Sequence, residues 1–298
     1  MGKRLGSSLL LLLTAVIWGS AFVAQRSGMD SVGPFTFLAA RSVLTVAALS
    51  PLALPRLRKL DRRALPRTLL GGFICGAALF LGSGLQQWGL VTTTAGKAGF
   101  LTALYIVFVP LGKRLFGQRI GLRVWLSVAL AAGGLYCLCA AGESAGFRPG
   151  DLLLLSCAVM FAVHILTVDR LGPALDSILL SYFQFLTCAV LAWALAFCLE
   201  TPAWSGLKRA WLPIAYAGLL SGAVGYTLQI VAQKHADPTV ASLLMSLESV
   251  FSALAGWILL REALSAWELL GCALVFAAVI LSQLPQKPAS VPFSDQTG

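Results

Sequence analysis

Two ionisable residues lie within segments of the sequence that are otherwise apolar enough to cross a membrane. Glu248 is the only charged residue from Pro238 to Leu260 and comes ten positions after the proline. In a helix that rises about 1.5 Å per residue it would lie roughly 15 Å deep, near the middle of a hydrocarbon core about 30 Å thick. Arg41, the only charge in residues 34–54, would lie roughly 10 Å from the outer end of its helix. Ionisable groups at such depths usually face protein or water, so both residues indicate a polar functional site inside the membrane.

Both residues also allow a structural interpretation. A protonated or paired Glu248 could lock two helices together. The expected depths of Glu248 and Arg41 differ by only about 5 Å, which is within the reach of an arginine side chain. Each charge alone in hydrocarbon would cost about 2.5 to 3.5 kcal/mol on an insertion scale, so an ion pair could offset both costs. The sequence leaves a structural ion pair and a substrate-binding site open.

Three further residues are candidates by type and position. His164, in the apolar run 152–168, could relay protons, although a lone histidine bonded to a neighbouring helix is the commoner arrangement. Trp18 lies near mid-depth, where it could wall a cavity or pack between helices. Lys97 begins a helix near the outer surface, where a lysine side chain can reach the interface.

The sequence holds no phosphate loop, no nucleophile beside a base, no paired metal ligands and no covalent cofactor site. Its seven cysteines all lie in apolar runs, with neither metal-ligand spacing nor a disulfide framework. We therefore expect neither an enzyme nor a protein that holds a metal or a cofactor.

The composition is that of a membrane protein. Of 298 residues, 58% are hydrophobic and only 11% are charged, against about 25% charged in soluble domains. The formal net charge is +10, but the basic residues cluster between apolar runs and form no face interleaved with aromatics, which argues against nucleic acid as a partner. Basic residues gather in the connectors 56–67 and 113–123, which places both connectors in the cytoplasm. We expect a multi-pass membrane protein, embedded in the lipid bilayer.

Apolar runs predict ten membrane-crossing helices in an all-α protein. The two basic connectors are two crossings apart, as alternation across the membrane requires, so both termini are expected in the cytoplasm. The polar segment 142–151 then lies outside and divides the chain, and the polar, proline-rich residues 285–298 are expected to form a disordered cytoplasmic tail. The ten predicted helices are 5–25, 34–54, 68–90, 97–111, 124–142, 152–168, 176–199, 211–233, 238–262 and 266–284.

The two halves of the chain are related by an internal repeat. Adding 143 to each residue number from Ala98 to Phe108 gives five identities in eleven positions, which indicates a repeat. Because each half has five crossings, an odd number, residues 1–142 and 150–284 are expected to be inverted five-helix repeats with a substrate site near the midplane between them. The polar pairs at this offset are Tyr105 with Glu248, Arg41 with Gln184, and Gln86 with Gln229.

Four segments carry a resemblance to a known family. They are IWGSAFVAQ at 17–25, LAARSVL at 38–44, TTAGKAGFLTALYIVFVPL at 93–111 and SLESVFSALAGWILLREAL at 246–264. With these segments the chain resembles, over nearly all of its length up to Leu284, the ten-helix EamA-type transporters of the drug/metabolite transporter (DMT) superfamily. Gln118 departs from the pattern, because the first repeat of the family often has an acid there. The resemblance implies export or exchange of small metabolites across the plasma (inner) membrane, through a central cavity lined by both repeats. It favours as site residues Trp18, Arg41, Tyr105, Gln184 and Glu248.

We therefore expect a secondary active transporter that exports or exchanges a small metabolite by alternating access around a midplane cavity. The substrate could be amino acid-like, drug-like or another small polar or amphipathic compound, and a titratable residue such as Glu248 could couple its movement to protons. The candidate substrate-binding residues are Trp18, Arg41, Tyr105, Gln184, Glu248 and His164. A non-transporting membrane sensor or scaffold protein is the alternative.

Overall fold

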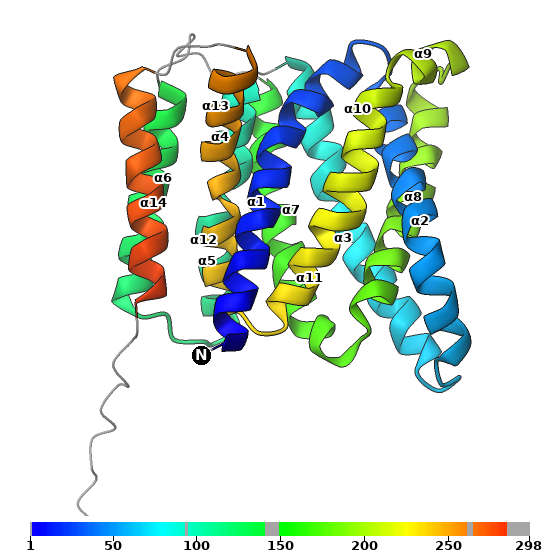
Figure 1. The fold of residues 1–298 in the computed structure, drawn as a ribbon, viewed down its shortest axis with the longest axis horizontal. Helices are drawn as coiled ribbons and strands as arrows, with labels where there is room; N and C mark the ends of the chain where they lie inside the picture. Colours follow the sequence, from blue (N-terminus) through cyan, green and yellow to red (C-terminus); the bar gives the residue numbers. More distant parts are fainter. Residues whose placement is uncertain (1, 93–94, 141–148, 261–264, 285–298) are drawn as a thin grey trace, which may run out of the picture.

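Helices make up all the regular secondary structure of the residues that the structure, a computed structural model, describes: 2–92, 95–140, 149–260 and 265–284. They stand side by side in one bundle (Figure 1). In these ranges, eight helical segments are long and apolar enough to span a membrane, and two shorter apolar helices accompany them. The chain is therefore an all-helical membrane protein. The predicted linker 142–151 falls largely, and the predicted tail 285–298 entirely, outside the described residues.

The first half of the chain forms α1 (Gly2–Met29), α2 (Pro34–Lys59), α3 (Leu65–Thr92), α4 (Ala95–Ala103), α5 (Tyr105–Leu115) and α6 (Leu122–Ala140). The second half forms α7 (Pro149–Leu171), the 3-10 turn η1 (Gly172–Ala174), α8 (Ser177–Leu199), α9 (Trp204–Arg209), α10 (Trp211–Ala215), the π-helix η2 (Tyr216–Tyr226), α11 (Thr227–Gln233), α12 (Pro238–Met245), α13 (Leu247–Leu260) and α14 (Ala266–Gln283). Of these, α10, η2 and α11 run on as one apolar segment long enough to span a membrane.

Two of the predicted helices are interrupted near their middles. The predicted helix 97–111 breaks at Leu104, between α4 and α5, and the predicted helix 238–262 breaks at Ser246, between α12 and α13. Tyr105 is the first residue after the first break, and Glu248 lies in the first turn after the second. Discontinuous helices in corresponding places of two halves are typical of transporter binding sites. Both interruptions therefore place a candidate residue beside a break in a helix.

The same close crossing of two helices occurs twice between the two halves. A Cβ atom at Gly76 of α3 would lie 2.6 Å from the carbonyl oxygen of Gln184 in α8. A Cβ atom at Gly218 of η2 would lie 2.8 Å from the carbonyl oxygen of Arg41 in α2, and Arg41 is the repeat partner of Gln184. Gly76 and Gly218 are therefore equivalent positions, at which two helices touch almost backbone to backbone.

The π-helix η2 holds one residue that the first half lacks. One more residue separates Gly218 from Gln229 than separates Gly76 from Gln86, although both glycines and both glutamines are equivalent. Most of η2, from Gly218 to Tyr226, lies in this interval. A π-helix has a wider turn than an α-helix, so it accommodates an inserted residue without breaking the helix, and it occurs frequently at functional sites.

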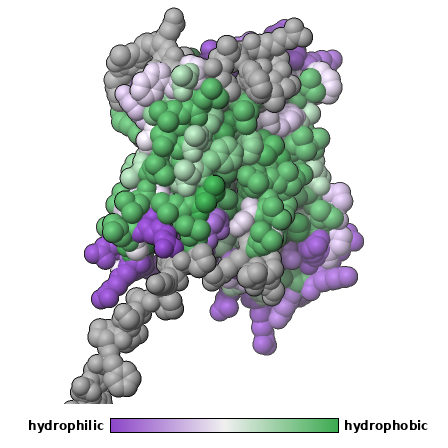
Figure 2. All heavy atoms as spheres, turned by 60° about the vertical axis from the view of Figure 1, so that its left-hand side comes forward, coloured by the Kyte–Doolittle hydropathy of each residue, from purple (hydrophilic) through white to green (hydrophobic). Residues whose placement is uncertain are grey.

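One end of the bundle is basic. The start of α1 and the connector between α2 and α3 lie at this end, the lower one in Figure 1, and α9 lies at the other. Arg56 of the 56–67 connector lies 3.6 Å from Asp176, which caps the start of α8. We call this the basic end. Figure 2 shows a wide apolar band across the visible face of the bundle and hydrophilic side chains toward its ends, as expected of a protein embedded in a bilayer.

Candidate functional site

A cavity lies between the two halves of the bundle, with an empty volume of about 490 Å³ counting its open side. Its lining comes from α1 to α5 of the first half and from α7, η2, α11 and α13 of the second. Five of the six predicted substrate-binding residues line it, and the sixth, Gln184, lies behind it. The lining residues are Trp18, Ala21, Phe22, Gln25, Arg41, Gln86, Thr102, Tyr105, Phe161, His164, Ile165, Ser221, Tyr226, Gln229 and Glu248.

The lining follows the internal repeat. A space that is lined by both members of many repeat pairs must contain the axis that relates the halves. Substrate sites of transporters with inverted repeats lie at this place. Five pairs of repeat partners face the cavity: Trp18 with Phe161, Ala21 with His164, Phe22 with Ile165, Gln86 with Gln229, and Tyr105 with Glu248.

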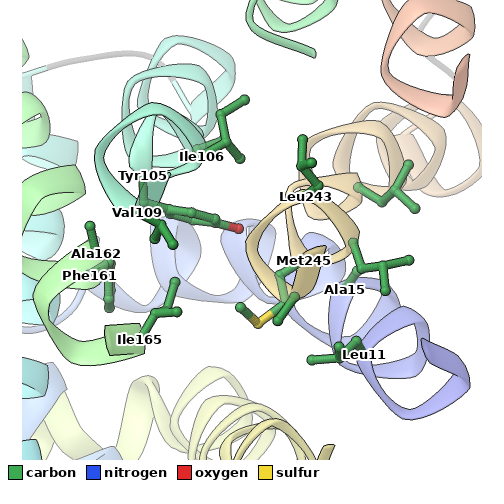
Figure 3. Close-up of a cluster of buried hydrophobic side chains, with 14 of the residues drawn as sticks. Leu11, Ala15, Tyr105, Ile106, Val109, Phe161, Ala162, Ile165, Leu243 and Met245 are labelled. Atoms are coloured by element: carbon green, nitrogen blue, oxygen red, sulfur yellow. The ribbon is translucent and has the colours of Figure 1, made fainter. Parts of the chain in front are cut away.

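Tyr105 and Glu248 are in direct contact. The Tyr105 hydroxyl donates a hydrogen bond of 3.1 Å to Oε1 of Glu248, and both side chains are buried. Figure 3 shows the Tyr105 ring extending from its helix toward the helix that carries Leu243 and Met245. The backbone of α1 is also close, because a Cβ atom at Gly19 would lie 2.6 Å from the carbonyl oxygen of Glu248. The first half of the chain therefore contacts Glu248 twice, at its carboxyl group through Tyr105 and at its backbone through α1.

Arg41 lines the same cavity without contacting Glu248. Its side chain is 6% exposed, and among the described residues it forms no ion pair with Glu248 and its Nε has no hydrogen-bond partner. The structural ion pair that the sequence left open is thus not formed. The sequence argument matched only the depths of Arg41 and Glu248 along their helices. It did not specify where those helices lie around the bundle, and their positions keep the two residues apart.

His164 and Gln184 are bonded to each other. Nε2 of His164 lies at hydrogen-bond distance, 3.0 Å, from Oε1 of Gln184, and both side chains are buried. His164 faces the cavity, whereas Nε2 of Gln184 has no partner in the described part of the protein. This is the arrangement in which a lone histidine is bonded to a neighbouring helix.

The side chain of Lys97 lies outside the described residues.

Trp18 and Tyr226 form an aromatic wall of the cavity. Their ring centroids are 4.6 Å apart, and the Tyr226 ring lies edge-on to His164 at 5.9 Å. Nε1 of Trp18 donates a 3.3 Å hydrogen bond to the carbonyl oxygen of Ser221 in η2. A Cβ atom at Gly225 would lie 2.6 Å from the same nitrogen, so the indole needs a glycine there. The π-helix therefore determines where both aromatic rings lie.

Sequence reasoning missed the amide side chains of the cavity as site residues. The repeat offset reveals Gln86 and Gln229 as a polar pair, but Gln25 has no signal beyond its place near the end of a predicted helix. Nε2 of Gln86 donates to Oγ1 of Thr102 at 3.4 Å. The Oε1 atoms of Gln25 and Gln229 have no partner among the described residues. Because buried polar groups are nearly always hydrogen-bonded, these two oxygens and Nε of Arg41 are available to a ligand.

An ion pair joins the two halves toward the basic end. Lys113 of α5, whose side chain is buried, contacts Asp237, the N-cap residue of α12. Asp237 also accepts a 2.8 Å hydrogen bond from the backbone N–H of Thr239. Asp169 of α7 lies within electrostatic range of both members of the pair. The contact between α5 and α12 is therefore ionic as well as apolar.

Comparison with known proteins gives the same picture over the whole chain. A model of the EamA-like transporter family matches residues 5–140 and 148–284. An "uncharacterized transporter" of Archaeoglobus fulgidus is 32% identical over 95% of this chain and 87% of its own length. A transporter of Chlamydia muridarum named for S-adenosylmethionine and S-adenosylhomocysteine is 25% identical over 90% of each chain. The "uncharacterized inner membrane transporter YedA" of Escherichia coli K12 is 23% identical over 93% of this chain and 92% of its own.

A solved crystal structure has the same fold. It superposes with a TM-score of 0.78 and covers 93% of this chain and 96% of its own, at 20% sequence identity. The family model spans both halves of the chain, and the archaeal relative is similar over almost its full length. The protein therefore belongs to the EamA-like transporter family and is a multi-pass membrane transporter.

Proposed function

We propose that this protein is a secondary active transporter that moves a small metabolite by alternating access around the central cavity. The observation that carries the proposal is the lining of the cavity by five pairs of repeat partners, with Tyr105 bonded to Glu248 between the halves. In an inverted repeat, exchanging the conformations of the halves turns an opening on one side of the membrane into an opening on the other. A site between the halves can then be reached from both sides.

We propose that the basic end lies in the cytoplasm, together with both termini. The eight long and two shorter apolar helical segments support ten crossings, and clusters of Arg and Lys in short connectors favour the cytoplasmic side. Residues 1–142 and 150–284 are then two inverted repeats. Reporter fusions at Leu60 and Gly117 should score inside and a fusion at Trp204 outside. Leu60 and Gly117 on opposite sides would contradict this topology.

Opening of the cavity toward the cytoplasm requires the halves to separate at the basic end. The ion pair between Lys113 and Asp237 spans the two halves there, so it holds in the state that is closed to the cytoplasm and breaks in the other. Broken helices, such as those at Leu104 and Ser246, give each half a place where the backbone can bend during this movement.

Glu248 is the carboxyl group that a coupling proton would occupy. It is the one carboxylic acid among the described residues that line the cavity, and buried acids of this kind mark proton pathways in transporters. The names of the relatives support a small metabolite as substrate and the inner membrane as location. Protons and substrate would then move against each other or together through one site.

Transport by purified protein in lipid vesicles tests the proposal. A panel of labelled metabolites is offered with and without an imposed pH gradient, and saturable uptake of at least one of them is expected. Glu248→Gln should abolish this uptake while the protein still inserts and folds. In a protein stripped of native cysteines, Gln229→Cys should react with a membrane-impermeant thiol reagent from each side in turn as substrate and gradient are varied. A sensor or scaffold would keep that position sealed from both sides and show no uptake.

A further inference from the structure

An apolar layer closes the cavity toward the basic end. Val109 comes four residues after Tyr105 on α5, which runs toward this end, and Met245 of α12 comes three residues before Glu248. The side chains of Val109 and Met245 are fully buried and belong to one apolar cluster, which Figure 3 shows. A metabolite in the cavity cannot cross this layer until the halves separate. The layer consists of Leu11, Ala15, Val109, Leu243 and Met245.

Gln233 brings a polar side chain to the same depth as this layer. It follows Gln229, which lines the cavity, by four residues on α11, and so lies about one turn closer to the basic end. Its side chain is 3% exposed, and its Nε2 donates a 3.2 Å hydrogen bond to the carbonyl oxygen of Ile165 in α7. The repeat partner of Gln233 is Leu90, which is fully buried. The packing of the fold therefore accepts an apolar residue at this position, and the amide of Gln233 needs another explanation.

The amide oxygens of Gln229 and Gln233 lack a donor. Neither Oε1 atom has a hydrogen-bond partner among the described residues. An amide oxygen only accepts hydrogen bonds, so each missing partner must bring an N–H or O–H group. Because Gln233 does not line the cavity, a metabolite bound there cannot supply it. Buried water typically bonds to polar groups that are otherwise unsatisfied, so water is the partner that fits both oxygens.

Two acids lie beyond these glutamines, at the basic end. Asp169 comes four residues after Ile165 on α7, and Asp237 comes four residues after Gln233. The two carboxyl groups are within electrostatic range of each other and of Lys113, which contacts Asp237. Asp169 is partly exposed and forms no ion pair in the described part of the chain. One ammonium group thus balances one of the two carboxylates, and Asp169 is able to exchange a proton with the solvent at this end.

We infer that bound water along α11 forms a proton route between Glu248 and Asp169, so that the protein conducts protons while the basic end is closed to the metabolite. The proton leaves the carboxyl group of Glu248, passes along water bonded to Gln229 and Gln233, and binds the carboxylate of Asp169, which releases it to the solvent. Only O–H bonds break and form, and the Glu248 carboxylate takes the next proton from the open side of the cavity. The inference rests on the proposed coupling role of Glu248 and adds an activity to it, which is proton conduction without metabolite.

Proton flux into lipid vesicles that contain the full-length protein and no metabolite tests the inference. An outward potassium gradient with valinomycin drives protons inward, and a trapped pH dye reports the initial rate. The rate with the wild type should exceed that of protein-free vesicles. Glu248→Gln removes the proton carrier and Gln233→Leu interrupts the water, so each should lower the protein-dependent rate about tenfold or more, as expected when one hydrogen bond of the route is lost. Gln233→Asn keeps an amide and should restore part of the rate.

Gln87→Leu is the matched control. Gln87 of α3 is as deeply buried as Gln233, and its Oε1 likewise has no partner among the described residues. It lies toward the opposite end of the bundle, donates to Sδ of Met29 at 3.3 Å and does not line the cavity. Its proton flux should equal that of the wild type. The inference is overturned if the wild type conducts no faster than protein-free vesicles, if Gln233→Leu conducts like the wild type, or if Gln87→Leu loses as much flux as Gln233→Leu.

Metabolite exchange separates a proton route from a general structural role. Exchange of labelled for unlabelled metabolite at equal pH requires no net movement of protons, so Gln233→Leu should exchange at the rate of the wild type. A loss of exchange as large as the loss of proton flux would assign Gln233 to the metabolite path and overturn the inference. If Gln233→Leu does not fold, Gln233→Met and Asp169→Asn take its place, and a wild-type proton flux in both overturns the inference.

The same vesicles distinguish failure of this inference from failure of the proposed transport function. Saturable metabolite uptake without a protein-dependent proton flux would refute the proton route and leave transport standing. A proton flux that depends on Gln233, without uptake of any metabolite of the panel, would support the route and refute transport.

Discussion

Tyr105 and Glu248 occupy the same position in the two halves of the chain, and the hydroxyl group of one donates a 3.1 Å hydrogen bond to the carboxyl group of the other. Exchanging the conformations of the halves maps this pair onto itself. Under the proposed alternating access, the contact is therefore expected in both end states of the transport cycle. The contact between Lys113 and Asp237 does not join two repeat partners. The exchange maps it onto two other residues, so it is expected in only one of the two end states.

Tyr105→Phe should slow transport without unfolding the protein. The substitution removes one hydroxyl group, and a hydrogen bond to a charged group contributes about 1.5–3 kcal/mol, so a tenfold or larger fall in initial uptake rate is expected. Tyr136→Phe is the control, because that side chain is 64% exposed on α6. Equal uptake by wild type and Tyr105→Phe would show that the contact has no role in transport.

Breaking the ion pair at the basic end should shift the protein toward the state open to the cytoplasm. Lys113→Met leaves Asp237 without its partner, and Asp237→Asn in the same chain removes the unpaired charge while an asparagine still caps α12. The cytoplasmic labelling rate of a cysteine at position 229 should rise in both variants. Arg56→Met is the control: its ion pair with Asp176 is 46% and 42% exposed and contributes at most about 1 kcal/mol. A labelling rate that does not respond to Lys113→Met would mean that the pair has no part in closing this end.

The crossing of α2 and η2 should not tolerate a side chain at Gly218. In Gly218→Ala the new methyl group would lie 2.8 Å from the carbonyl oxygen of Arg41, which is backbone and cannot rotate away. We expect a loss of about 1–3 kcal/mol in the free energy of unfolding, measured by denaturation in detergent. Gly133→Ala on α6 should cause no loss, since nothing lies within 4 Å of its added Cβ atom. Similar losses in the two variants would indicate that helix flexibility, and not close contact, explains the glycine.

Deletion of Leu220 should be tolerated better than deletion of Leu81. The two leucines lie in corresponding stretches of η2 and α3 and are similarly exposed, at 43% and 45%. Removing one residue from η2 gives it the spacing of the first half, so it can continue as an α-helix. Removing one residue from α3 rotates all that follows by about 100° and turns Gln86 away from the cavity. The yield of folded protein on size-exclusion chromatography and the melting temperature check this prediction. Equal losses of yield and melting temperature in the two deletions would contradict the assignment of the extra residue to η2.

The repeat offset predicted much of the site. It paired Tyr105 with Glu248 and Gln86 with Gln229, and all four side chains line the cavity. Such pairing works because internal symmetry fixes relative positions in three dimensions. Depth along a helix does not, which is why the argument that placed Arg41 level with Glu248 could not decide whether the two would touch.

The π-helix could not be predicted from the same pattern. The offset between the halves is the same at Arg41 and at Gln86, and it differs by one residue only between them, at Gly76 and Gly218. Compared with the first half, the second half has one residue fewer between Gln184 and Gly218 and one residue more between Gly218 and Gln229. The two differences cancel in the numbering, so a sequence comparison that aligns only the polar pairs does not detect them.

The extra residue of η2 also bears on which way the protein faces at rest. If the halves were identical, the inward-open and outward-open forms would have equal free energies, and the resting population would be divided equally. The carbonyl group of Ser221 in η2 accepts a hydrogen bond from the side chain of Trp18. The repeat partner of Trp18 is Phe161, whose side chain has no N–H group to donate. The two forms therefore differ in free energy, and a difference of about 1.4 kcal/mol would leave ten molecules facing one way for each that faces the other. Under the proposed alternating access, one extra residue in η2 thus gives the empty carrier a preferred direction before any gradient is applied.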